Sequence, residues 1–165
     1  MDNWYRIDST SEDAKDPLTM FWEFHDFRLW SFSYSPGEDV IDAILEYGSH
    51  DMKVHLRFID LRGFNLCATQ NYEADWYEGN TISIDDDDGN IFWIDVDWFK
   101  QGDAASEFDT WVKREKLVYA ILDKNGEPIE IPDGIKNQTW RSYNYKTHKY
   151  DEIEHHFSPK PVSMG

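Results

Sequence analysis

The sequence predicts an all-β fold, or a β-rich α+β fold. In it, an antiparallel meander forms a sandwich or an open barrel, with one or two short helices. Three strand-like runs follow one another closely between residues 25 and 61. Turn signals separate about eight short strands along the whole chain. Hydrophobic residues make up 40% of the chain and aromatic residues 16%, which is typical of a folded chain with a real core.

The meander comprises residues 25–34, 39–47 and 53–61. In the first run the even spacing of apolar residues breaks between Leu29 and Phe32. An extra residue in a strand reverses the facing of everything after it, so we expect a β-bulge at Trp30–Ser31. Ser35-Pro36-Gly37-Glu38 is predicted to be a turn, because Pro presets φ and Gly accepts positive φ.

The second and third runs each predict one inward face through alternation of apolar residues. In the second run we expect the alternate residues from Ile41 to Tyr47 to form the core face. In the third run His55 and Arg57 point outward, and the inward side chains are those of Val54, Leu56 and Phe58.

Further elements follow from local patterns. We expect a fourth strand over 64–69 and a hairpin of 81–85 with 91–97, joined by an Asp-Gly connection. Residues 104–116 are predicted to be a short helix, because Phe108, Trp111 and Val112 have helical spacing and Asp103 can cap it. A second hairpin is expected from 117–122 and 128–131, followed by a last strand over 139–145.

The chain length of 165 residues predicts a single domain, 1–165. We expect an ordered core over about residues 20–146. The N-terminal arm, 1–19, and the C-terminal tail, 147–165, are polar and are expected to be loosely attached. Trp4 and Tyr5 are expected to pin the arm against the domain, because large aromatic side chains rarely stay free in solvent.

The net charge of −17 excludes some classes of partner. Nucleic acid and anionic membranes would both be repelled by such a surface. Between Gly63 and Phe99 the chain has nine acidic residues and neither Lys nor Arg. The acidic middle of the chain therefore favours a basic protein as the partner.

Cys67 is the single cysteine, which fits a reducing compartment. The first residues lack the basic and apolar regions of a signal peptide. No apolar run approaches the roughly 20 residues of a membrane-spanning helix. These observations predict a cytoplasmic protein.

No motif predicts a cofactor, a metal site or a catalytic residue. The run Asp85–Asp88 fails as an EF-hand, because Ile84 would occupy the first ligand position. A looser cation site at this run stays open as an alternative. The pair His25-Asp26 could meet His55 only if their strands were neighbours, and nothing in the spacing requires that.

A resemblance adds to this reading. The segments Phe24-His25-Asp26-Phe27-Arg28, Asp75-Trp76 and Trp93-Ile94-Asp95-Val96-Asp97 make residues 24–99 similar to small, acidic, all-β bacterial proteins of uncharacterised function. Some members of similar groups are classed as immunity proteins, which neutralise toxins of neighbouring cells. The resemblance implies a cytoplasmic bacterial binding protein without catalysis, and it transfers no functional residues.

The leading hypothesis is a non-catalytic protein-binding module with an acidic, aromatic-rich face, because Trp and Tyr dominate binding hot spots. The predicted partner-binding residues are Glu73, Asp75, Trp76, Tyr77, Asp85, Asp86, Asp87, Asp88, Asp97 and Trp98. The alternative is a β-sandwich that binds a carbohydrate or another small ligand by stacking rings on Trp and Tyr. A third hypothesis is a metal-assisted enzyme that uses the aspartates. The oligomeric state stays open, since open sheet edges could pair two copies.

Overall fold

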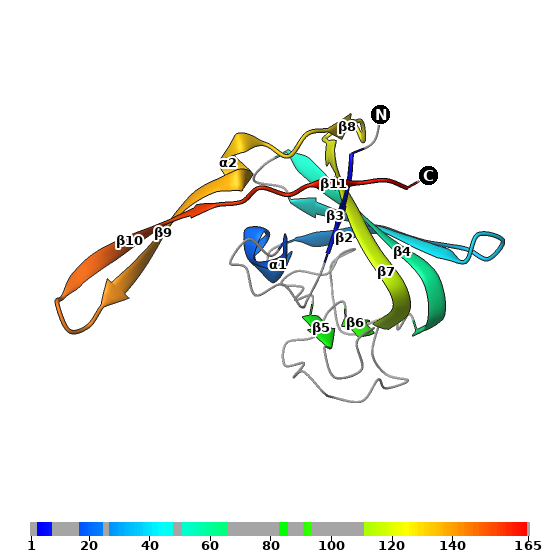
Figure 1. Ribbon diagram of the computed structural model, residues 1–165, viewed down its shortest axis with the longest axis horizontal. Helices are drawn as coiled ribbons and strands as arrows, with labels where there is room; N and C mark the ends of the chain where they lie inside the picture. Colours follow the sequence, from blue (N-terminus) through cyan, green and yellow to red (C-terminus); the bar gives the residue numbers. More distant parts are fainter. Residues whose placement is uncertain are drawn as a thin grey trace, which may run out of the picture.

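The computed structural model describes residues 3–7, 17–24, 27–47, 51–65, 83–85, 91–93 and 111–164. These residues form two antiparallel sheets and a few short helical turns (Figure 1). The predicted all-β class is confirmed. The main sheet curves strongly along its longest strands but does not close into a barrel.

The main sheet has nine strands, and six of them follow one path, β11-β1-β7-β4-β3-β2. The strands β5 and β6 pair with each other, β6 also pairs with β7, and β8 pairs with β7. Their bounds are β1 Trp4–Arg6, β2 Arg28–Ser35, β3 Val40–Tyr47, β4 Met52–Asn65, β5 Ser83–Asp85, β6 Ile91–Trp93, β7 Trp111–Asp123, β8 Pro128–Ile129 and β11 Pro161–Val162.

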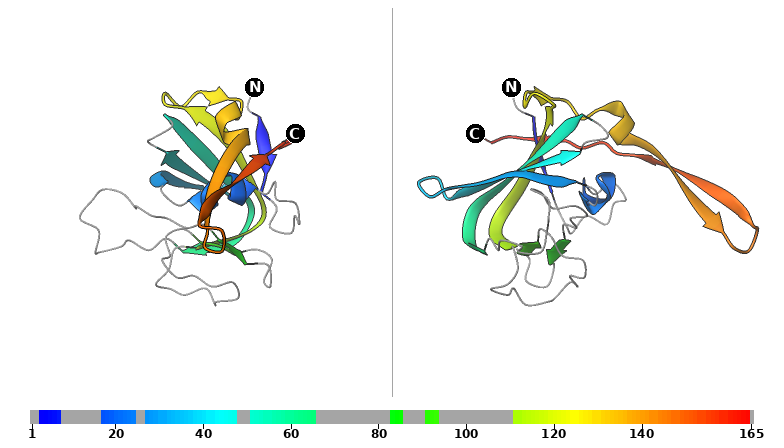
Figure 2. Two further views of the ribbon diagram at one scale, coloured as in Figure 1. Left: turned by 90° about the vertical axis from the view of Figure 1, so that its left-hand side faces the viewer. Right: turned by 180° about the vertical axis from the view of Figure 1, so that it is seen from behind.

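The remaining described elements lie beside this sheet. Two four-residue helices, α1 (Pro17–Met20) and α2 (Asp133–Lys136), and a 3-10 turn, η1 (Trp22–Phe24), are short. The second sheet has two strands only, β9 (Asn137–Asn144) and β10 (Lys149–His156). In the right-hand view of Figure 2 this pair extends well beyond the main sheet.

The predicted meander is confirmed as β2, β3 and β4. The register between β2 and β3 shifts between Leu29 and Ser31, where the sequence predicts a bulge. The turn at 35–38 is also present, with the Glu38 N–H donating to the Ser35 carbonyl at 3.1 Å. These features form as predicted because bulges and tight turns depend on a few neighbouring residues.

The core lies against one face of the main sheet. The predicted inward side chains of β3 and β4 are buried there, including Ile41, Leu45 and Leu56. Tyr119 adds a buried ring from β7. The segment around α1 and η1 covers this face with four fully or almost fully buried side chains: Met20, Phe21, Phe24 and Phe27.

Two predicted elements are wrong where the structure describes them. Residues 64–65 do not begin a separate strand, because β4 runs on through Arg62 and Gly63 with a register shift between Leu61 and Gly63. The predicted helix is wrong from Trp111 onward, because these residues pair with β4 as the start of β7. A ladder between strands of 14 and 13 residues outweighs a local helical spacing, and Trp and Val also favour strands.

The two ends are attached more firmly than predicted. Trp4 and Tyr5 are buried, as expected. They belong to the strand β1, which pairs with both β7 and β11. The expectation of a loose tail is wrong for residues 149–157 and 161–162. Residues 149–156 form β10, Phe157 is buried in the core, and Pro161–Val162 form β11. These segments lack a long apolar run that would predict a strand. They become ordered because they pair with other strands: β10 with β9, and β11 with β1.

The opposite, outer face of the main sheet carries a smaller apolar cluster and a polar network. Trp4 packs with Val118 and Ala120 in this cluster. The Trp4 ring also meets His55 edge-on at 5.0 Å between ring centroids, and the Arg57 guanidinium lies 4.8 Å from the Trp4 ring centroid. The predicted outward facing of His55 and Arg57 is therefore confirmed.

Asp42 links the two basic side chains of this network. His55 Nε2 lies 2.6 Å from Asp42 Oδ1, and Arg57 Nε donates to the same oxygen at 2.8 Å. Burial favours the neutral carboxyl group and works to raise its pKa. The hydrogen bonds and charges of His55 and Arg57 outweigh burial, so the pKa of Asp42 lies below its ordinary value of 3.8.

We therefore expect acid to destabilise the protein through Asp42. A carboxyl group with a lowered pKa in the folded state stabilises that state fully above the unfolded pKa of about 3.9. This stabilisation is lost as the pH falls through the folded-state pKa. The variant Asp42→Asn removes the charge-assisted bonds and should lower the free energy of unfolding near pH 6 by about 1–3 kcal/mol.

Urea unfolding of both proteins between pH 2 and pH 6 measures this effect. The difference between them should shrink as the pH falls below 4. The exposed variant Asp133→Asn is the matched control, since its carboxylate makes only a surface pair with Lys136. A constant difference across the whole pH range would show that the Asp42 charge is not the cause.

Candidate functional site

The predicted acidic face lies almost entirely outside the described residues. Of its members, only Asp85 belongs to a described element, where it ends β5 opposite Ile91. The others are Glu73, Asp75, Trp76, Tyr77, Asp86, Asp87, Asp88, Asp97 and Trp98. Cys67 and the pair His25-Asp26 lie outside as well. These assignments therefore stay predictions.

The strongest described candidate is the two-stranded sheet of β9, residues 145–148 and β10, which we call the hairpin arm. Its register runs without a break from Asn137 opposite His156 to Asn144 opposite Lys149. The arm projects away from the main sheet in Figure 1 and in the right-hand view of Figure 2. The sequence predicts a strand over 139–145, which corresponds to β9, but it predicts a loose tail where β10 lies. Residues 145–148 contain no Gly or Pro that would indicate a hairpin turn.

Gln138 anchors the base of the arm. Its side chain is buried, and its Nε2 donates to the Met20 carbonyl at 2.8 Å and to the Ile135 carbonyl at 2.7 Å. Its Oε1 accepts a hydrogen bond from Trp140 Nε1 at 2.8 Å. One amide side chain thus ties β9 to α1, to α2 and to the next inward residue of its own strand.

The second strand is anchored where it leaves the arm. The Phe157 N–H donates to the Lys136 carbonyl at 2.7 Å, and the Phe157 ring is buried in the core. His156 Nδ1 lies 2.9 Å from Asn137 Oδ1, at the last pair of the ladder. Both strands are therefore held at the base by buried or paired groups.

The turn at the far end has its own local support. Asn144 Oδ1 accepts hydrogen bonds from the backbone N–H groups of Lys146 (2.9 Å) and Thr147 (3.3 Å). Asn144 Nδ2 donates across the ladder to Asp151 at 3.0 Å. An Asn side chain that satisfies the turn backbone replaces the Gly that such turns commonly use.

One face of the arm carries three tyrosines and one arginine near its tip. We call this cluster the tyrosine tip: Tyr143, Tyr145, Tyr150 and Arg141. Tyr143 and Tyr150 are directly opposite each other, with ring centroids 5.3 Å apart. Tyr143 also meets Tyr145 at 4.9 Å, and the Arg141 guanidinium lies 4.6 Å from the Tyr150 ring centroid. The exposed fractions are 38% for Tyr143, 82% for Tyr145 and 59% for Tyr150.

The other face of the arm is apolar nearer the base. Trp140 is opposite Ile153, which is 51% exposed. The centroids of the Trp140 and His155 rings lie 3.9 Å apart. His155 continues the stack to Phe157 at 6.1 Å. Its buried Nε2 has no hydrogen-bond partner among the described residues.

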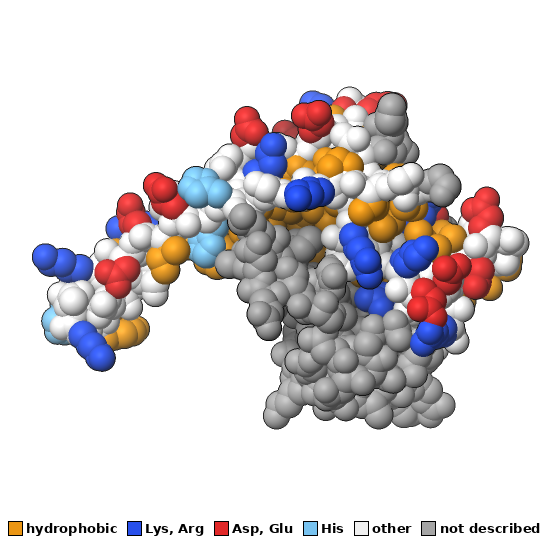
Figure 3. All heavy atoms as spheres, viewed as in Figure 1, with side chains coloured by type: hydrophobic (Ala, Val, Ile, Leu, Met, Phe, Trp, Pro, Cys, Tyr) orange, Lys and Arg blue, Asp and Glu red, His pale blue; other side chains and the backbone are white. Residues whose placement is uncertain are grey.

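The space-filling view shows how the charges lie on the arm. Lys and Arg side chains reach outward at the tip, beside exposed hydrophobic ones (Figure 3). Residues 141–150 include Arg141, Lys146 and Lys149 and no acidic residue. The tip therefore combines cationic groups with tyrosine rings in a chain whose net charge is −17.

This arrangement suits recognition of another molecule. A two-stranded ribbon is at best marginally stable in water, and both strands of the arm have a free edge in the described part of the structure. Exposed Tyr, Trp and Arg side chains are the types that dominate binding hot spots. The rings are also positioned against one another before any partner arrives, which lowers the entropy cost of binding.

Within the described residues there is no group of three or more His, Cys, Asp or Glu side chains placed to hold a metal ion. None of the described helices has the length and apolar character needed to span a membrane.

Comparisons with known proteins give no relative. No protein-family model matches the chain, and neither a curated protein nor a solved structure matches it. The resemblance to immunity-type bacterial proteins therefore stays a prediction.

Proposed function

We propose that this protein is a non-catalytic protein-binding module that engages its partner with the hairpin arm. The observation that carries the proposal is the exposed, mutually packed tyrosine tip on a ribbon anchored only at its base. Tyr side chains supply a large contact area with few rotatable bonds, so an arm of this kind loses little entropy on docking.

In this proposal the partner carries a basic surface that the acidic segment 73–98 attracts, and the tyrosine tip, which is itself cationic, docks on a different, non-basic part of the same partner. Long-range attraction speeds the encounter. The rings of Tyr145 and Tyr150, which are exposed in the free protein, become buried against the partner and slow dissociation. In an immunity-like role, the protein would occlude a cationic surface of a toxin with its acidic segment and hold the toxin with the hairpin arm.

The arm is tested by a pull-down with the tagged full-length protein from cells that encode it, followed by binding measurements with the captured protein. Three substitutions, Tyr143→Ser, Tyr145→Ser and Tyr150→Ser, remove the rings but leave the anchored base intact. We expect the combined variant to bind at least about a hundredfold more weakly, since single hot-spot residues contribute about 2 kcal/mol or more.

A variant of the β7–β8 turn, Lys124→Ser with Glu127→Ser, is the matched control, because both side chains are exposed and lie outside the arm. Its affinity should equal that of the original protein. Equal binding by the tyrosine variant and the control would exclude the arm as the binding surface.

Charge is tested separately by Asp86→Asn, Asp87→Asn and Asp88→Asn in one chain. The association rate should fall and its dependence on salt should flatten, with little change in the dissociation rate. An unchanged association rate would remove the acidic segment from the proposal and leave the arm to be judged by its own variants.

A further inference from the structure

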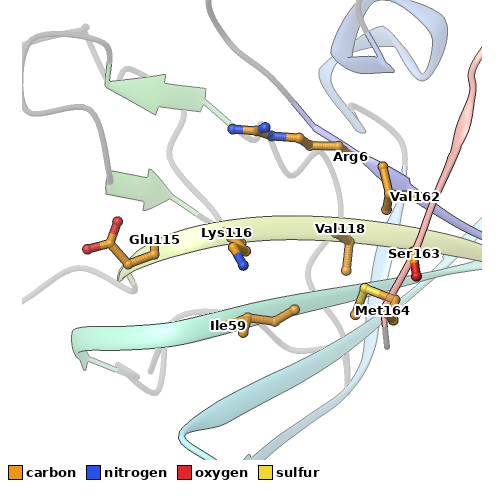
Figure 4. A pocket seen from close by; sticks show the side chains of 8 residues that line it. All are labelled: Arg6, Ile59, Glu115, Lys116, Val118, Val162, Ser163 and Met164. Carbon is orange, nitrogen blue, oxygen red and sulfur yellow. The ribbon is translucent and has the colours of Figure 1, made fainter.

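The outer face of the main sheet contains a pocket that the arm does not reach. It has a volume of about 520 Å³ and lies where β1, β4, β7 and β11 come together (Figure 4). Pockets of about 300–1,000 Å³ are the usual size for small-molecule sites. Its walls come from strands far apart in sequence, so no local pattern predicts it.

Apolar and charged groups occupy different parts of this pocket. Val118, Val162 and Met164 lie together at one end, and Ile59 lies on β4 between this end and the charged groups. Val118 is buried in the sheet, whereas Met164 is 40% exposed. Ser163 is the one polar side chain of the apolar end (Figure 4). The apolar end can therefore accept a hydrocarbon group.

The charged end is positive after its ion pair is taken into account. Glu115 forms an ion pair with Arg62, which compensates its charge. Arg6 and Lys116 also line the pocket, and neither forms an ion pair with a described side chain. Figure 4 shows the polar ends of both side chains on the side away from Val162 and Met164. Arg6 and Lys116 thus line the same hollow without an acidic partner among the described side chains.

A further guanidinium group, that of Arg114, lies near Arg6. Burial lowers the pKa of Arg114, and the positive charge of Arg6 lowers it further. Arg6 is therefore held near a like charge in a chain whose net charge is −17.

We propose that this pocket binds a small anionic amphiphile, with its carboxylate at Arg6 and Lys116 and its alkyl chain along Ile59, Val118, Val162 and Met164. The charged head finds two cations, and the chain removes apolar surface from water. No aromatic ring of the described residues lines the pocket, so the site differs from one that stacks sugars. The inference is independent of the proposed role of the arm.

The test is isothermal titration calorimetry of the full-length protein with hexanoate, octanoate and decanoate below their micelle concentrations. Affinity should rise about fourfold for each added CH₂ group until the apolar end is filled. Octanol should bind at least about tenfold more weakly than octanoate, and octyltrimethylammonium should not bind. No heat of binding with any of the carboxylates up to millimolar concentration would overturn the proposal.

The variant Arg6→Gln with Lys116→Gln should weaken octanoate binding at least about tenfold and leave octanol binding unchanged. Both side chains are exposed, so the variant should fold, and circular dichroism verifies this. The matched control is Lys124→Gln with Lys149→Gln, which removes two cations that do not line the pocket. Equal octanoate affinity in the two double variants would overturn the proposal.

The apolar end is tested by Met164→Glu, which places a negative charge where the alkyl chain should lie. Decanoate binding should fall more than hexanoate binding, since only the longer chain reaches this end. A peptide with a free carboxyl terminus and an apolar last residue is the competing occupant. Tighter binding of this peptide than of decanoate would assign the pocket to a peptide and overturn the small-ligand proposal.

Discussion

Replacing Phe21 by Ala is expected to lower the free energy of unfolding by about 3–5 kcal/mol. Phe21 is fully buried, and its ring contacts three other aromatic rings of the core. The centroid distances are 5.2 Å to Phe24, 6.1 Å to Phe27 and 5.5 Å to Tyr119. Tyr119 belongs to β7, so this single ring joins the segment around η1 to the middle of the main sheet.

The large effect follows from where the segment sits. Residues 17–24 and Phe27 cover the inner face of the sheet with few strand hydrogen bonds of their own, so their rings provide most of the attachment. Removing the central ring leaves a cavity that the neighbouring rings cannot fill without losing their mutual packing. A loss of this size is a large share of the 5–15 kcal/mol that stabilises a typical domain.

Urea unfolding followed by tryptophan fluorescence measures the effect. Tyr145→Ala is the matched control, because it also removes an aromatic ring but from a side chain that is 82% exposed. Its free energy of unfolding should change by no more than about 0.5–1 kcal/mol. A loss below about 1 kcal/mol for Phe21→Ala would mean that the segment around η1 does not close the core as described.

Replacing Gln138 by Leu is expected to cost about 2–4 kcal/mol and to loosen the base of the hairpin arm. Leu fills a similar volume but cannot donate to the carbonyls of Met20 and Ile135 or accept from Trp140 Nε1. A buried polar group that loses its partner costs about 1–3 kcal/mol, and this substitution affects three such groups. Some of these three polar groups will form hydrogen bonds with water as the base of the arm opens. The total cost therefore stays below the sum of the three separate costs.

Amide hydrogen exchange separates this local effect from a general loss of stability. In the Gln138→Leu variant, the amides of β9 and β10 should exchange faster, by more than those of β3 and β4. Thr139→Ala, at the exposed neighbouring position, should leave the pattern unchanged. Uniformly faster exchange over the whole chain would show that Gln138 contributes to general stability and does not anchor the arm.

The same variant bears on the proposed function. A loosened base leaves the tyrosine tip intact but no longer fixes the direction in which it projects, so ordering the arm must then occur on binding. We expect partner affinity to fall less for Gln138→Leu than for the triple tyrosine variant. Octanoate binding should not change, because none of the residues that line the pocket belongs to the arm.

Local chemistry in the sequence determined the centre of the fold. Alternation of apolar residues placed Ile41, Leu45, Val54 and Leu56 in the core, and the broken spacing after Leu29 located the bulge. The turns at 35–38 and 123–126 form because their Pro, Gly and Asp residues suit tight turns. Each of these features depends on a few consecutive residues, so the sequence alone is sufficient for them.

The tertiary structure decided what depends on distant partners. Trp111–Lys116 became strand because a long β4 is available for pairing. The short strands β1 and β11 form because β1 pairs with β7 and β11 pairs with β1, across almost the whole chain. The candidate sites show the same division. Arg141, Tyr143 and Tyr145 belong to the predicted last strand and share one of its faces by alternation, but the placement of Tyr150 beside them required β10. The pocket required four strands to meet, and no periodicity or spacing within a single segment encodes such a meeting.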